Sequence, residues 1–152
     1  MEIRPDLARF LAGPVLMTLG TRDDANRPMI ARGTAVRACG PGTIRISFCL
    51  RHWPETLANL LDNGWLALVV VQPTDYRAFQ FKGRATIAPP TPRDLAEAHA
   101  CRERTYALLG GHGIPREQIA AWAEWDELAM AEMAVERIFE QTPGPRAGRV
   151  VT

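Results

Sequence analysis

The chain has 152 residues, 47% of them hydrophobic and 23% charged, and its 18 basic and 17 acidic residues leave a formal net charge of +1. This length suits one domain with one core, and the balanced charge excludes the broad basic face of a nucleic-acid-binding protein. No apolar run approaches the roughly 20 residues of a membrane span, and the first residues lack the features of a signal peptide, so we expect a cytoplasmic protein without membrane contact.

The first half of the chain predicts a helix, three strands and a second helix. Pro5 suits the first turn of a short helix, and Gly13 follows its expected end. Three runs with strand character come next, over residues 15–21, 29–37 and 43–49. Residues 53–63 then space their leucines helically, with a proline in the first turn and Asn63-Gly64 at the stop. The three strands most simply form a meander, and the second helix leads to the fourth strand.

A hairpin predicted over residues 65–85 has a polar face on its second strand. An apolar run over 65–71 is followed by a turn and by a strand over 76–85, where Gln80 and Lys82 share one face. Lys82 is the only lysine among the 18 basic residues, so the chain's preference for arginine does not explain it. Such a lysine is either a solvated edge residue or part of a binding face, and both readings stay open.

Two helices and a last strand complete the pattern. Thr91, a proline and Asp94 stand in helix-start order and predict a helix to about residue 109, with another from about residue 115. In the last strand, over residues 130–141, Met133, Val135 and Phe139 alternate with glutamates, which predicts that these three share the dry face.

This order of elements predicts the fold class. No strand-helix-strand alternation requires a parallel sheet, so a small antiparallel barrel of six strands with the helices outside fits best. We expect a mainly β protein, one domain over residues 1–152, with a helical insertion at about residues 92–126.

Common catalytic and metal motifs are absent from the sequence. The only serine, Ser47, lies within a predicted strand and not at a nucleophile elbow, and the glycines at 110–113 follow a helix, so they suit a helix stop and not a phosphate loop. The three histidines lack metal-ligand spacing, and the three cysteines fit neither a zinc site nor a disulfide framework. We therefore expect no metal site and assign no catalytic side chain.

The motifs in their order along the chain resemble one known family. Residues 32–37 read Arg-Gly-Thr-Ala-Val-Arg, Phe48-Cys49 closes the third strand, Asn59-Leu60-Leu61-Asp62-Asn63 ends the helix, and residues 76–85 carry basic and glutamine residues ahead of a glycine. This arrangement resembles the pyridoxamine 5'-phosphate oxidase-like family of FMN-binding split barrels. The resemblance implies a six-stranded antiparallel split β-barrel of the FMN-binding type, and a homodimer with two FMN sites at the subunit interface.

The resemblance also implies which residues hold the cofactor, because a phosphate dianion and an electron-rich flavin edge need charge-assisted donors, which arginine supplies in a fixed fork. The expected neighbours of the flavin are Arg32, Gly33 and Thr34; those near its ribityl phosphate are Phe48, Cys49, Arg51 and Thr56; and those from the facing strand are Arg77, Gln80 and Lys82. In such a site the FMN carries out the hydride or electron transfer.

Two departures from the family pattern limit what the resemblance implies. Pro54-Glu55-Thr56 stands where family oxidases have a Ser-Arg-Lys run, and the C-terminal Arg-x-His of the true oxidases is missing. The leading expectation is thus an FMN-dependent oxidoreductase with a small-molecule substrate that the sequence does not identify. The alternative is a non-catalytic protein on the same fold: a binder of haem, with His52 or His112 as ligand, a deazaflavin binder, or a dimer without cofactor.

Overall fold

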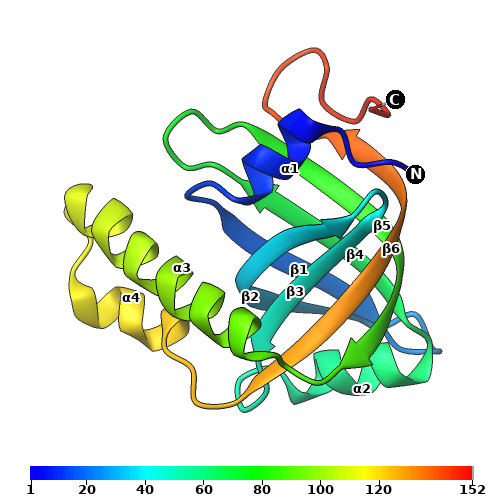
Figure 1. Ribbon diagram of the computed structural model, residues 1–152, viewed down its shortest axis with the longest axis horizontal. Coiled ribbons are helices and arrows are strands. Elements are labelled where there is room, and N and C mark those ends of the chain that lie inside the picture. The colour runs from blue at the N-terminus through cyan, green and yellow to red at the C-terminus, as the bar shows by residue number, and fades with distance from the viewer. Residues whose placement is uncertain (152) are drawn as a thin grey trace.

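Six antiparallel strands close into a barrel in the order β1-β2-β3-β6-β5-β4, with helices around it (Figure 1). The computed structural model describes residues 1–151. The strands are β1 (Leu16–Arg22), β2 (Pro28–Gly40), β3 (Thr43–Cys49), β4 (Trp65–Val71), β5 (Ala78–Ala88) and β6 (Leu128–Glu140). The helices are α1 (Pro5–Leu11), α2 (Pro54–Asp62), α3 (Pro92–Gly111) and α4 (Arg116–Ala123). The predicted fold class is confirmed.

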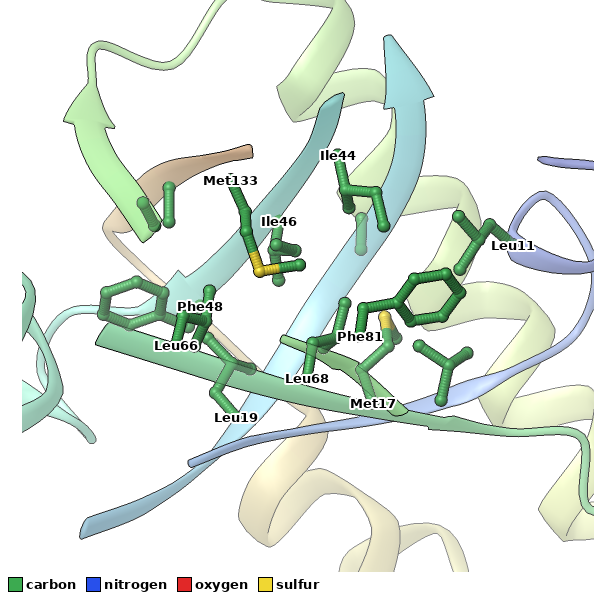
Figure 2. Close-up of a cluster of buried hydrophobic side chains, with 14 of the residues drawn as sticks. Leu11, Met17, Leu19, Ile44, Ile46, Phe48, Leu66, Leu68, Phe81 and Met133 are labelled. Atoms are coloured by element: carbon green, nitrogen blue, oxygen red, sulfur yellow. The ribbon is translucent and has the colours of Figure 1, made fainter. Parts of the chain in front are cut away.

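Large apolar side chains fill the interior of the barrel. In β4 the alternate residues Leu66, Leu68 and Val70 are at most 3% exposed, as the period of two predicts. Figure 2 shows Phe48 and Phe81 among leucines, isoleucines and methionines from neighbouring strands, and both rings are fully buried. Burying side chains of this size contributes about 1.5–3 kcal/mol each. A ligand of any size must therefore bind on the outside of the barrel.

Two short helices lie at opposite ends of the barrel. Helix α1 buries Leu7, Phe10 and Leu11 at one end, where the Phe10 ring meets the Phe79 ring edge-on with centroids 5.1 Å apart. Helix α2 lies at the other end, where the Asn59 amide donates a buried hydrogen bond of 3.1 Å to the Thr21 hydroxyl. These two ends give the reference points for locating the site residues.

Helices α3 and α4 lie beside the barrel, along β2 (Figure 1). The first half of α3 packs on the barrel through Ala98 and Cys101, which join the main core. The second half of α3 and α4 share a separate cluster formed by Tyr106, Leu109, Ile119 and Ala123. None of the helices within residues 1–151 is long and apolar enough to cross a membrane.

Two local predictions are wrong. Tyr76 and Arg77 belong to the turn before β5 and not to the strand, because Tyr76 adopts a positive φ of 58° and the Arg77 N–H donates to Asp75 Oδ1. In β6, a bulge lies opposite the step from Lys82 to Gly83 and reverses the alternation. Ile138, 1% exposed, therefore enters the core, and Phe139 faces outward.

The bulge leaves no room for a side chain at Gly83. A Cβ atom there would collide with the backbone carbonyl oxygen of Ala134, which cannot rotate away, whereas a Cβ on Gly110 near the end of α3 would meet nothing within 4 Å. We expect Gly83→Ala to lower the free energy of unfolding in urea by about 1–3 kcal/mol and Gly110→Ala to raise it by up to about 1 kcal/mol. Equal effects of the two substitutions would contradict this register.

Candidate functional site

The outer face of β2 and β3 carries most of the polar residues that the sequence points to. Arg45 and Ser47 alternate with the buried Ile44 and Ile46 of β3 and therefore face outward, and Arg37 of β2 pairs with Arg45 on the same side. Arg32 lies an odd number of positions before Arg37, and it shares this outer face because the pairing of β2 is irregular between the two. A register shift between Gly33 and Ala35 lets Thr34 share this face, and its hydroxyl lies 2.6 Å from that of Ser47. This outer face, with α3 and α4 beside it, is the candidate site.

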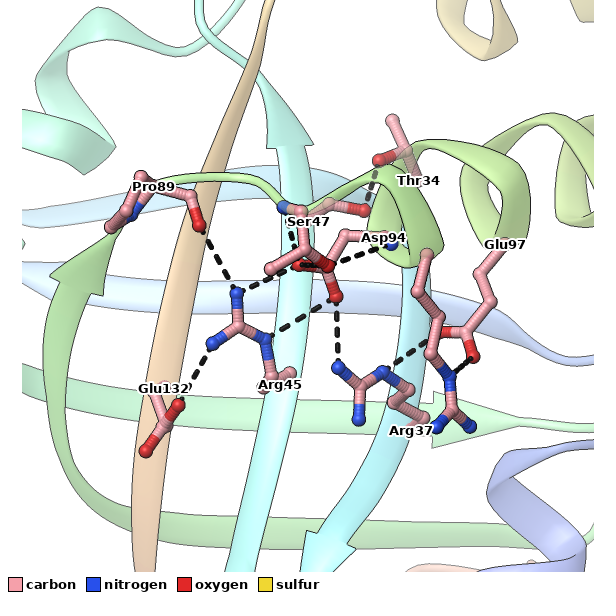
Figure 3. Close-up of polar contacts among 10 residues, drawn as sticks. Thr34, Arg37, Arg45, Ser47, Pro89, Asp94, Glu97 and Glu132 are labelled. Atoms are coloured by element: carbon pink, nitrogen blue, oxygen red, sulfur yellow. Dashed lines mark hydrogen bonds and ion pairs between the residues drawn. The ribbon is translucent and has the colours of Figure 1, made fainter.

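One end of the site is closed by an ion cluster around Asp94, the third residue of α3 (Figure 3). Asp94 is 2% exposed and accepts hydrogen bonds from Arg37 Nη2 at 3.0 Å and from Arg45 Nη2 at 2.7 Å. Thr91 completes a capping box with the same carboxylate. Glu97 adds a second carboxylate to Arg37, with Nε 2.9 Å from Oε2. The charge of Arg37 is therefore already paired with two carboxylates within the protein.

The Asp94 cluster changes the acidity of its central carboxyl. Burial by itself would raise the pKa of Asp94, but the hydrogen bonds from Arg45, Thr91 and Arg37 outweigh it and hold that pKa well below its ordinary value. The carboxylate therefore stays ionised in the folded protein under all mild conditions, and its charge ties α3 to both strands.

The opposite end of the site is open and basic. Arg32 is exposed, and its guanidinium lies 5.1 Å from the centre of the Trp122 ring on α4. Arg51, just beyond β3, pairs with Asp126 at 2.6 Å, and both side chains are more than half exposed. Cys49 is buried, and its thiol donates to Asp126 Oδ1 at 3.5 Å. An exposed pair of this kind is worth little, so Arg51 is free to exchange its partner for a phosphate.

The start of α2 borders the same open end. Its first N–H groups have no acceptor within the helix, which favours an anion there, while Glu55 in the first turn opposes one. Thr56 is fully buried, and its hydroxyl has no hydrogen-bond partner among the described residues. The Thr56 side chain therefore does not reach the surface where a phosphate would bind.

Phe48 and Gly33 are likewise turned away from the outer face. Phe48 points into the barrel, where it is completely buried (Figure 2). A Cβ atom on Gly33 would point at Met17 and Leu19, which also face the interior. Only the backbone of these two residues is within reach of a ligand on the outer face.

Space beside Trp122 is limited. The cavity bounded by Trp122, Thr34 and Arg102 measures about 20 Å³, enough for one water molecule. A planar ligand lying against Thr34 must therefore displace the Trp122 side chain.

Gln80 and Lys82 lie on the opposite wall of the barrel. In the order of strands, β5 is separated from β2 by two strands in either direction. Both side chains face outward, and Lys82 Nζ lies 5.1 Å from the centre of the Phe139 ring. Lys82 also borders a mainly apolar hollow of about 400 Å³ that includes Trp65 and Ala67. Within one chain these residues do not meet Arg32.

Arg77 is separate from both groups. Its guanidinium lies 5.3 Å from the centre of the Phe10 ring and 5.4 Å from that of Phe79, at the α1 end of the barrel. Of the residues predicted to surround one cofactor, the structure thus places Arg32, Thr34, Cys49 and Arg51 in one region. Arg77, Gln80 and Lys82 of the same chain lie elsewhere.

Sequence reasoning missed the two acidic residues that organise the site, Asp94 and Asp126. Asp94 was visible only as a helix-start residue, and its two arginine partners lie 57 and 49 positions away in the chain. No local pattern marks such a pairing. Within residues 1–151, no three His, Cys, Asp or Glu side chains gather to hold a metal ion.

Comparisons with solved structures identify the fold. HupZ of Group A Streptococcus is similar over 96% of this chain and 100% of its own, with 21% identity and a TM-score of 0.60. A putative pyridoxamine 5'-phosphate oxidase from Lactobacillus delbrueckii matches 91% of this chain and 93% of its own, with 12% identity and a TM-score of 0.57. HutZ, the haem storage protein of Vibrio cholerae, matches 92% and 95%, with 13% identity and a TM-score of 0.52. The chain has the split-barrel fold of pyridoxamine 5'-phosphate oxidase-like proteins.

Two further comparisons return nothing. Neither protein-family models nor curated protein sequences match the chain. The likeness is thus one of fold, at identities too low to transfer an activity.

The Asp94 cluster predicts a pH dependence of stability. Because the folded pKa of Asp94 is depressed, its contribution is complete above the unfolded pKa of about 3.9 and is lost as the pH falls below that value. We expect Asp94→Asn to cost about 3 kcal/mol at pH 7, since Arg37 and Arg45, both partly buried, each lose one of their two carboxylate partners, and to flatten the decline in stability between about pH 5 and pH 2.

Urea unfolding across that pH range measures both effects. Asp24→Asn, at an exposed turn residue, is the matched control and should unfold like the wild type. A variant at Asp94 with unchanged stability at pH 7 would contradict the role assigned to the cluster.

Proposed function

We propose that this protein is an FMN-binding flavoprotein, an oxidoreductase that works as a homodimer with a cofactor site at each end of the subunit interface. The observation that carries the proposal is the open basic end of the β2–β3 face, where Arg32 lies against Trp122 and Arg51 shortly precedes the start of α2. The split-barrel fold shared with a putative pyridoxamine 5'-phosphate oxidase supports it. Three free cysteines agree with a cytoplasmic location, which we also propose.

A second copy is needed to complete such a site. Arg32 and Lys82 lie on opposite walls of one barrel, so a ligand contacted by both must lie between two chains. The outer side chains of β4 are apolar and half-buried, as at Val69 and Val71, and Ile30 nearby is 63% exposed. An apolar face of this kind suits an interface between two copies.

The residues of this chain would divide the binding of FMN between them. Arg51 and the free N–H groups of α2 suit the phosphate, once Arg51 releases Asp126. Arg32 and Thr34 suit the flavin, with Gln80 and Lys82 of the facing subunit approaching from the other side. Arg37 takes no part, because Asp94 and Glu97 hold it. Bound FMN would supply the hydride or electron transfer.

Haem is the second candidate, because a haem storage protein shares the fold and His52 lies half-buried next to Arg51. His112 is exposed at the far end of α3 and is less suited to a site on the barrel. A deazaflavin would use the same arginines as FMN. The absorption spectrum distinguishes haem from FMN, since haem gives a Soret band and FMN gives bands at roughly 375 and 450 nm.

Titration of FMN into the protein tests the leading proposal. Each of Arg32→Ala and Arg51→Ala should raise the Kd by about tenfold or more, because each removes a charge-assisted donor. Arg93→Ala is the matched control, since Arg93 is an exposed arginine of α3 paired with Glu97. Quenching of the tryptophan fluorescence follows the titration, and the part of it that is lost in a Trp122→Phe variant reports the ligand's arrival beside Arg32. Unchanged affinity in both variants would reject the site.

Mixed dimers test whether the site is shared. Arg32→Ala and Lys82→Ala homodimers should each bind FMN weakly, whereas a mixed dimer of the two contains one intact site and one doubly altered site. We expect half of the wild-type stoichiometry at wild-type affinity in the mixed dimer, measured by fluorescence titration. If the mixed dimer does not recover FMN binding, Arg32 and Lys82 act on a site within one chain, which would contradict the proposal.

A further inference from the structure

The cavity at the α1 end of the barrel lies away from the candidate site and is lined by several arginines. It measures about 350 Å³, and the argument rests on six of its lining residues, Arg77, Phe79, Glu140, Arg146, Arg149 and Val151. They come from the β4–β5 turn, β5, the end of β6 and the C-terminal segment, which Figure 1 shows at the same end of the barrel as α1. We call it the arginine cavity, and we infer that it binds a phosphate monoester with a compact apolar group.

Charge gives the first reason. Arg146 pairs with Glu140, whose carboxylate lies 3.2 Å away, and Arg4 at the rim pairs with Asp6. Within residues 1–151, Arg77 and Arg149 have no carboxylate at ion-pair distance, although both line the cavity. Two uncompensated guanidinium groups match the charge of a phosphate dianion, and arginine is the side chain best suited to bind it with paired hydrogen bonds.

Preorganisation gives the second reason. The Arg77 guanidinium lies over the Phe10 and Phe79 rings at 5.3 and 5.4 Å, so its position is defined without an acidic partner. The chain around Arg149 is held by backbone hydrogen bonds: the Glu140 N–H donates to the Arg149 carbonyl at 2.9 Å and the Gly148 N–H to the Glu140 carbonyl at 2.7 Å. The bound anion would therefore meet one guanidinium already in place, that of Arg77, and a second carried by a fixed backbone at Arg149.

The shape of the cavity defines the rest of the ligand. Phe79, 5% exposed, and Val151 add apolar surface to the cavity beside the arginines, and the Arg77 guanidinium itself lies 5.4 Å from the centre of the Phe79 ring. The volume lies at the lower end of the range of small-molecule sites. A phosphate attached to a ring or a short branched chain fits this combination of basic and apolar lining.

Titration of phenyl phosphate into the protein by calorimetry tests the inference. We expect saturable binding that weakens about tenfold in Arg77→Ala and in Arg149→Ala, whereas Glu140→Gln, which removes the only carboxylate among the six residues, tightens it. Arg93→Ala serves as the control arginine on α3 and should bind like the wild type. Circular dichroism confirms that each variant is folded; Arg149 is exposed and its replacement removes no core contact.

Two further titrations separate this site from other sources of binding. Arg51→Ala should retain full affinity for phenyl phosphate, because Arg51 lies at the α2 end; loss of binding in this variant would assign the phosphate to the candidate FMN site instead. Benzoate should bind about tenfold more weakly than phenyl phosphate, since it carries one charge fewer. No saturable binding, unchanged binding in both arginine variants, or equal affinity for benzoate would each overturn the inference.

Discussion

The salt bridges of Asp94 hold helix α3 against the barrel, and the geometry of the outer face follows from them. A carboxylate 2% exposed must be paired, and here Arg37 of β2 and Arg45 of β3 pair with it from one side while Thr91 caps it from the other. With the first turn of α3 fixed in this way, the helix runs along β2 and brings α4, and with it Trp122, next to Arg32. The same pairing withdraws one of the two basic side chains of the β2 motif from any ligand.

The two arginines of that motif therefore have different roles, although they occupy one strand face. Arg32 is exposed and lies against the face of an aromatic ring, whereas Arg37 is held by two carboxylates. A basic residue on a strand is evidence of a ligand site only when its charge is not already compensated inside the protein. By this criterion Arg32, Arg77 and Arg149 differ from Arg37 and Arg45, whose charges are compensated by carboxylates in and around the Asp94 cluster.

Much of the fold could be predicted from the sequence, because residues 43–49 alternate between polar and apolar, residues 65–71 form a continuous apolar run, and turn residues bound both. The β6 bulge could not, since it depends on the approach of Gly83 to the Ala134 carbonyl of a strand 51 positions away, and so Phe139 was placed on the wrong face. For the site, the resemblance located Arg32 and Arg51 on one surface. It did not reveal that Phe48 and Thr56 are buried, because burial depends on which way each strand and helix turns in the assembled barrel.

Helix α4 and the second half of α3 share a hydrophobic cluster of their own, so they and the barrel form two separate cooperative units of unfolding. Tyr106, Leu109, Ile119 and Ala123 contact one another and not the barrel core, so separating these helical segments leaves the interior of the barrel intact. Such a unit opens at a lower free energy than the strands, and its amide hydrogens exchange with solvent while those of the barrel stay protected. The segment that carries Trp122 is thus a local folding unit, able to rearrange on the surface of a rigid β-structure.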